Sequence, residues 1–208
     1  MTRCSQQSAC WLLALVGLAA LTIRGGMAAD AETAAGTTYA KDGATYTARH
    51  VFLSSLPAAN LLGICFEFKH LKEFYHQSEV KLVKSGTDWQ TVEYRSDYKV
   101  GTTTATYKKT IDLARHTVSF TMLSHRVSGW GMPVMTVSSG SYAISTSGNP
   151  RSITYEQSVT LSKEIGTLDW MMIQRKTNGF FADFEAYVRQ QESLRAKSAQ
   201  PPKKGSKP

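Results

Sequence analysis

The stretch at residues 168–192, LDWMMIQRKTNGFFADFEAYVRQQE, decides the fold, because here the apolar residues change from alternating by twos to a helical period. They return about every 3.6 residues and form one wide stripe, whereas most charged residues lie elsewhere. The stripe contains Met172, Ile173, Phe180, Phe184, Tyr187 and Val188. The pattern predicts one long amphipathic helix at residues 168–191, with Gly179 as a place where it can bend or approach another backbone.

Upstream of this helix the apolar residues alternate by twos. Residues 46–52 and six stretches between residues 78 and 162 have this strand-like pattern, with turns such as residues 85–88 and 147–150 between them. One side of the alternation is apolar and the other polar, which is typical of an antiparallel sheet covered on a single face. The residues predicted on the covered face include Val92, Tyr94, Tyr98, Ala105, Tyr107, Ile111, Leu113, Val118, Phe120, Met122, Tyr142, Ile144, Ile153, Tyr155, Val159 and Leu161.

A short helical excursion separates the first strand from the others. In residues 50–68, HVFLSSLPAANLLGICFEF, Ser55 is a suitable helix cap and Pro57 fits the first turn. Gly63 is expected to divide residues 57–76 into two short helices. The predicted class is therefore α+β: a curved, seven-stranded antiparallel sheet around a long C-terminal helix, with two short helices after the first strand.

This element order, together with the two quoted stretches, resembles the helix-grip fold of the START-like (SRPBCC) superfamily. That superfamily includes polyketide cyclases, coenzyme Q-binding proteins and lipid-transfer domains. The resemblance covers residues 46–192, and it implies a mostly apolar cavity between sheet and helix for a lipid, isoprenoid, sterol or polyketide-like molecule. The superfamily has no short invariant motif to check, so the resemblance implies a ligand class and no catalytic residue.

The strand parities and the helix stripe give a candidate cavity lining. It consists of Tyr94, Tyr107, Phe120, Met122, Tyr142, Tyr155, Met172, Phe180 and Phe184, with Trp130 and Arg175 at the rim. An apolar wall with a few hydroxyls is the usual composition of a small-molecule pocket. Two alternatives stay open: the tyrosines fill the core and bond one another, and Trp130 and Arg175 are an ordinary loop residue and a surface arginine.

Metal, cofactor and nucleophile motifs give weak signals. On a helix His70 and Glu73 share a face, but His76 lies about 240° from His70 at 100° per residue, so we expect no metal site and no cofactor. The sequence at residues 138–141 lacks the strand-to-helix context of a nucleophile elbow. We expect Cys65 to be buried packing, and we expect the remaining histidines, His50, His116 and His125, to lie at the surface or at strand ends.

The ends of the chain have a different composition from the domain at residues 46–192. Residues 1–31 contain a basic start, a 15-residue apolar run and small residues suited to cleavage, which predict a secretory signal peptide and a periplasmic location. The alternative is an uncleaved anchor with Arg24 beyond the apolar run. Residues 32–45 are expected to be a flexible segment, and residues 193–208 a disordered basic tail.

The net charge of +8 is concentrated in that tail. Five basic residues without an acid stand in the last fourteen positions: Arg195, Lys197, Lys203, Lys204 and Lys207. The nearly neutral remainder argues against a nucleic-acid partner, and the tail suits either solubility or weak contact with a membrane surface. The predicted function is an exported binding or transfer protein for a hydrophobic small molecule; the alternatives are a cyclase- or dehydratase-like enzyme and a protein-binding module.

Overall fold

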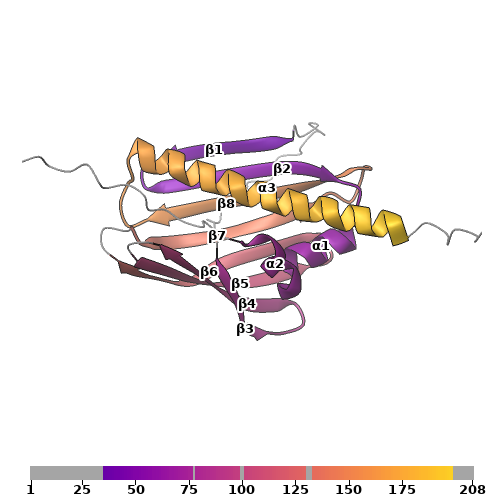
Figure 1. The fold of residues 1–208 in the computed structure, drawn as a ribbon, viewed down its shortest axis with the longest axis horizontal. Helices are drawn as coiled ribbons and strands as arrows, with labels where there is room; N and C mark the ends of the chain where they lie inside the picture. Colours follow the sequence, from indigo (N-terminus) through magenta and orange to yellow (C-terminus); the bar gives the residue numbers. More distant parts are fainter. Residues whose placement is uncertain (1–34, 77, 99–100, 130–132, 199–208) are drawn as a thin grey trace, which may run out of the picture.

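A single eight-stranded antiparallel sheet carries the fold (Figure 1). The computed structural model describes residues 35–76, 78–98, 101–129 and 133–198. The strands are β1 (Gly36–Asp42), β2 (Thr45–Ser54), β3 (Glu79–Ser85), β4 (Trp89–Tyr98), β5 (Gly101–Asp112), β6 (Thr117–Gly129), β7 (Met135–Ile144) and β8 (Arg151–Leu161). Their order in the sheet is β1-β2-β8-β7-β6-β5-β4-β3. The six strands predicted between residues 78 and 162 are confirmed.

Two short helices carry the chain across the sheet. Helix α1 (Ala58–Phe66) and helix α2 (Phe68–Phe74) follow β2 and lead to β3 at the opposite edge. From β3 the chain returns strand by strand until β8 pairs with β2. Helix α1 lies against β5, β6 and β7, and helix α2 contacts β3 and the last helix. The predicted pair of short helices is therefore confirmed.

The last helix, α3 (Thr167–Ser198), runs along the covered face of the sheet (Figure 1). Its buried residues follow one another at helical spacing: Ile173, Thr177, Phe181, Phe184 and Val188. Residues 193–198, expected to belong to a disordered tail, are its last turns, so that boundary was wrong. Among the described residues no helix is both long enough and apolar enough to cross a bilayer.

Strand β1 corrects a second prediction. Residues 32–45 were expected to be flexible, yet residues 36–42 pair with β2 along their length and raise the strand number from seven to eight. Alternate side chains of β1 reach across to the rest of the fold. Tyr39 Oη donates to Asn178 Oδ1 at 2.7 Å, and Lys41 Nζ donates to the Ile165 carbonyl at 3.2 Å. A composition rich in Ala, Gly and Thr does not disclose such partners.

Among the side chains that the structure describes, one residue at the end of β5 departs from its predicted face. Leu113, predicted on the covered face, is 68% exposed because the chain turns away after Asp112. The predicted signal peptide, the loop residue Trp130 and residues 199–208 lie outside the described residues.

Candidate functional site

The structure brings together most of the predicted cavity lining between the sheet and α3. The residues buried there are Tyr94, Tyr107, Phe120, Tyr142, Tyr155 and Phe184, while Met122 and Phe180 are half-buried against the same core. Met172 is half-buried on α3, and Arg175, predicted at the rim, is exposed on that helix. Eight of the predicted lining residues therefore belong to one contiguous cluster, to which Met172 and Arg175 do not belong.

The aromatic rings of this cluster pack on one another. The ring centroids of Tyr142 and Tyr155 are 4.9 Å apart, and those of Tyr142 and Phe184 are 5.6 Å apart. Phe120 is 5.9 Å from Tyr155 in a stacked arrangement. These are ordinary contact distances for aromatic pairs. The predicted lining residues therefore contact one another between the sheet and α3.

Gly140 in β7 permits this close packing of the aromatic rings. A Cβ atom on Gly140 would lie 1.9 Å from the tip of the Phe120 ring, so the ring lies directly over the bare backbone of Gly140. Phe120 and Gly140 are paired neighbours on β6 and β7. The single ring of Phe120 thus covers the middle of the sheet.

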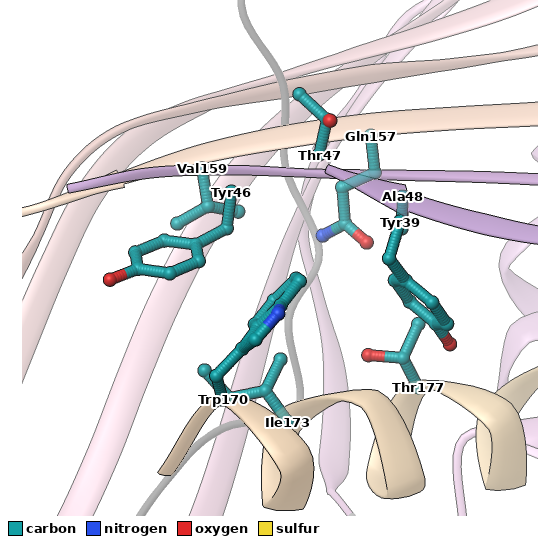
Figure 2. Close-up of a pocket in the computed structure, with 9 residues that line it drawn as sticks. All are labelled: Tyr39, Tyr46, Thr47, Ala48, Gln157, Val159, Trp170, Ile173 and Thr177. Atoms are coloured by element: carbon teal, nitrogen blue, oxygen red, sulfur yellow. The ribbon is translucent and has the colours of Figure 1, made fainter. Parts of the chain in front are cut away.

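A small pocket remains beside this cluster, between β1, β2, β8 and α3 (Figure 2). Its volume is about 10 Å³, which is near the minimum for one water molecule. The amide of Gln157 points toward α3 there, with Trp170 and Tyr39 on either side (Figure 2). The full lining is Tyr39, Tyr46, Thr47, Ala48, Gln157, Val159, Trp170, Ile173 and Thr177.

Several polar atoms on the covered face lack partners among the described residues. They are the hydroxyl of Tyr142, Nε2 of Gln157 and Nε2 of His125. A buried polar atom without a hydrogen bond costs about 1–3 kcal/mol, so such atoms are uncommon in a permanently dry core. This face of the sheet has more hydrogen-bonding capacity than the protein itself uses.

Lys109 is the most unusual residue of this face. Its side chain is only 2% exposed, and Nζ donates to the backbone carbonyl of Cys65 at 2.6 Å. The ammonium also lies 5.7 Å from the ring centroid of Tyr142. Burial disfavours the charged form and lowers the pKa of Lys109 to about 7, although the nearby Cys65 thiol partly opposes this shift.

Lys109 occupies its position because of strand parity and the end of α1. It shares its face of β5 with Tyr107 and Ala105, whereas Lys108 is exposed on the other face. The carbonyl groups in the last turn of α1 find no N–H donor within the helix. Lys109 Nζ donates to the carbonyl of Cys65, and the side-chain amide of Gln90 donates to that of Phe66. Lys109 was not among the predicted lining residues, although its parity with Tyr107 places it on the same face.

A second polar arrangement joins α3 to the β1–β2 edge. The ring of His50 is hydrogen-bonded to Thr37 Oγ1 and to Glu185 Oε1, each at 2.8 Å, and it stacks on Phe181 at 4.2 Å. Two helical turns further on, Glu192 Oε1 accepts from the Ser54 hydroxyl and the Ser55 amide, both at 2.6 Å. These contacts attach one side of α3 firmly to the sheet.

The histidines correct one prediction. His50 is buried and His125 is half-buried, so neither is a surface residue as expected, and burial lowers the pKa of His125 to about 4. His70 Nδ1 pairs with the Tyr187 hydroxyl at 2.7 Å, which joins α2 to α3. The described residues contain no group of three or more side chains suited to a metal ion.

A surface groove of about 190 Å³ lies where α1, α2 and the end of α3 meet. It is lined by Leu56, Asn60, Ile64, His70, Gln191, Leu194, Arg195 and Ser198. The bridge across it, from Arg195 to Asn60 Oδ1 at 3.1 Å, is exposed. The end of α3 beside α1 is therefore held less tightly than the side that faces β1 and β2, whereas beside α2 the bond between His70 and Tyr187 still attaches α3.

The structure is similar to several solved structures at low sequence identity. The Zhui aromatase/cyclase from Streptomyces sp. R1128 matches with 17% identity and a TM-score of 0.51, over 71% of this chain and 94% of that one. A STAR-related lipid transfer protein from Xanthomonas axonopodis matches with 13% identity and a TM-score of 0.52, over 74% and 98%. Ara h 8.0201 matches with 14% identity and a TM-score of 0.53, over 70% and 99%.

No family model matches the sequence, and no curated protein matches it. At these identities the structural likeness establishes the architecture alone. The observed sheet, short helices and long last helix have the same arrangement as those structures. The chain therefore has the helix-grip fold of START-like proteins.

Proposed function

We propose that this protein is exported and binds or transfers a hydrophobic small molecule, such as a lipid, isoprenoid or sterol, between the sheet and α3. The observation that carries the proposal is the covered face itself. It is mainly aromatic, yet it holds the unpartnered Tyr142 hydroxyl and the buried amine of Lys109. An apolar surface with a few unsatisfied polar groups suits a ligand better than a permanent core does.

A ligand between the sheet and α3 would separate some of these aromatic rings, because they contact one another. Phe120 is the side chain best placed to move, since it lies over Gly140 and no side chain of Gly140 stands beneath it. Rotation of Phe120 away from Gly140 would bare the middle of the sheet. The apolar surface of a ligand would then replace that of the ring, at about 25 cal/mol per Å² buried.

Access is proposed from the side of α1 and α2. On the opposite side, His50 and Glu192 attach α3 to β2 through short hydrogen bonds. On the α1 side, the exposed contact of Arg195 with Asn60 is worth little. Separation of α1 from α3 at the groove would lead under α1 to Lys109, which bonds the Cys65 carbonyl of that helix.

A second function, a cyclase- or dehydratase-like enzyme, is favoured by one observation. Lys109 is a buried titratable group with a pKa of about 7, and such a group can take up or release a proton near neutral pH. The Zhui aromatase/cyclase has the same fold. Lys109 lies beside the hydroxyl-bearing ring of Tyr142, so a polyketide-like substrate in the same place would meet both groups.

Native mass spectrometry of protein purified from its own host, followed by lipid extraction, tests the first function. A co-purifying lipid or isoprenoid is expected. The variant Phe120→Trp, which adds bulk over Gly140, should retain less of it, whereas Leu123→Trp on the exposed face is the control. Protein that is always empty, and that binds no lipid from vesicles, would contradict the proposal.

Two further measurements separate the alternatives. Turnover of an aromatic polyketide that is lost in Lys109→Met would favour the enzyme. N-terminal sequencing of protein from fractionated cells tests export, with a start near residue 32 expected in the periplasmic fraction. A start at residue 1 in the membrane fraction would favour the uncleaved anchor.

A further inference from the structure

We propose that the ligand of this site carries a carboxylate group, which Lys109 binds at the inner end of α1. The proposal rests on the proposed function, because it needs a ligand between the sheet and α3. It names the chemical class of that ligand: an apolar body with one acidic group, as in a free fatty acid or an isoprenoid acid.

The charges around Lys109 favour an acidic ligand. The described carboxylates form their ion pairs elsewhere, and Lys109 has no carboxylate partner among them. The titratable residues beside it are Cys65 of α1, through its thiol, and Tyr142 of β7, through the face of its ring, while Gln90 of β4 and Phe120 of β6 are uncharged neighbours. Buried cations in proteins are normally paired. A ligand carboxylate would supply the missing partner.

Lys109 can form more hydrogen bonds than the one to the Cys65 carbonyl. An ammonium group has three N–H donors, and the Cys65 carbonyl takes one of those of Lys109. The Tyr142 hydroxyl is fully buried and lacks a partner at full hydrogen-bond geometry among the described residues, although it interacts with the neighbouring Tyr75. Nζ of Lys109 lies 5.7 Å from the centroid of the Tyr142 ring. A carboxylate has two acceptor oxygens, enough to engage both groups.

A carboxylate gains more from Lys109 than a neutral oxygen does. The oxygen of an ester, ketone or alcohol accepts an ordinary hydrogen bond, whereas a carboxylate forms charge-assisted bonds, which are stronger, in a water-poor interior. Near neutral pH the empty site holds the amine in a mixture of both forms, since its pKa is about 7. Binding of a carboxylate stabilises the ammonium form, so the protein takes up a proton as the ligand binds.

The experiment compares cis-parinaric acid with its methyl ester, both followed by polyene fluorescence. The two probes share the same hydrocarbon chain and differ in charge. We expect the acid to bind about tenfold to a hundredfold more tightly than the ester, the range of one charged hydrogen bond. Calorimetry at pH 8 in two buffers of different ionisation enthalpy should show uptake of close to one proton per acid bound, and none for the ester.

Two lysine variants test whether Lys109 itself causes the preference for the acid over the ester. Lys109→Met should bind acid and ester with similar affinity and lose the proton uptake. Lys108→Met, the exposed neighbour on the same strand, should behave as wild type. Because Lys109→Met could fail to fold, the probe comparison and the proton uptake in the wild-type protein are decisive without it.

The outcomes are distinguishable. Equal affinity for acid and ester in the wild-type protein, or tighter acid binding without proton uptake, overturns the carboxylate proposal and leaves the proposed function standing. If neither probe binds, the proposed function is refuted and the carboxylate proposal falls with it. Preference for the acid that persists in Lys109→Met would place the acidic group elsewhere and also overturn the proposal.

Discussion

Replacement of Lys109 by methionine should change how the stability of the protein depends on pH. The pKa of Lys109 in the folded protein is about 7, against an ordinary value of 10.5. Between these pH values the unfolded chain binds the proton and the folded chain does not. The unfolded state therefore binds more protons, and the free energy of unfolding must rise with pH across this window.

The magnitude follows from the same shift. The penalty for the buried lysine is fully present below pH 7, declines as pH rises, and is absent above the ordinary pKa of 10.5. At about 1.4 kcal/mol per pKa unit, the wild-type protein should gain roughly 2 kcal/mol relative to Lys109→Met between pH 7 and pH 9. Other groups, including the Cys65 thiol, titrate in both proteins and cancel in the difference.

Urea unfolding followed by far-ultraviolet circular dichroism measures this difference at pH 7, 8 and 9. Lys108→Met is the matched control, because its side chain is exposed and its difference from wild type should stay flat. A flat difference for Lys109→Met, or one that falls with pH, would refute the argument that burial depresses the pKa of Lys109.

Three further predictions concern packing, the attachment of α3 and acid stability. Gly140→Ala should lower the free energy of unfolding by about 1–3 kcal/mol, because the new Cβ would overlap the Phe120 ring. Gly166→Ala, whose Cβ would meet nothing nearer than 3.9 Å, is the control in the same urea titration, and equal effects would contradict the close approach. Glu192→Ala should lower the free energy of unfolding by about 1–3 kcal/mol, because the Ser54 hydroxyl and the Ser55 amide lose their acceptor. Thermal melting measures the change, and an unchanged midpoint would show that the contact does not stabilise the fold. The pKa of His125 is lowered to about 4, so acidification from pH 6.5 to pH 4 protonates the unfolded chain first and reduces stability. His125→Gln should lose less stability over that range, and equal acid sensitivity in both proteins would exclude this role.

The order of elements was predictable because it depends on local periodicity. Alternation by twos fixed which strand residues share the covered face, and the change of period fixed the start of α3 to within one residue of Leu168. Parity alone placed Tyr107, Tyr142 and Tyr155 in one buried cluster. The same rule places Lys109 on the covered face with Tyr107, although the predicted lining did not include it.

The parts of the fold and of the site that could not be predicted depend on contacts between residues far apart in the sequence. The ordering of β1 comes from bonds such as that from Tyr39 to Asn178, which its own composition does not encode. Whether the aromatic face encloses a cavity depends on how Phe120 fits over Gly140, a question of shape across two strands.

The sequence by itself determined the helix-grip order and the chemistry of the face between sheet and helix. Periodicity is a local property, and each residue's side of a strand follows from its neighbours. Only the tertiary structure decided that the aromatic rings of this face contact one another, and that Lys109 stands among them beside the carbonyl of Cys65. Burial and pKa are set by all the atoms that surround a group, and those atoms come together only when the chain folds.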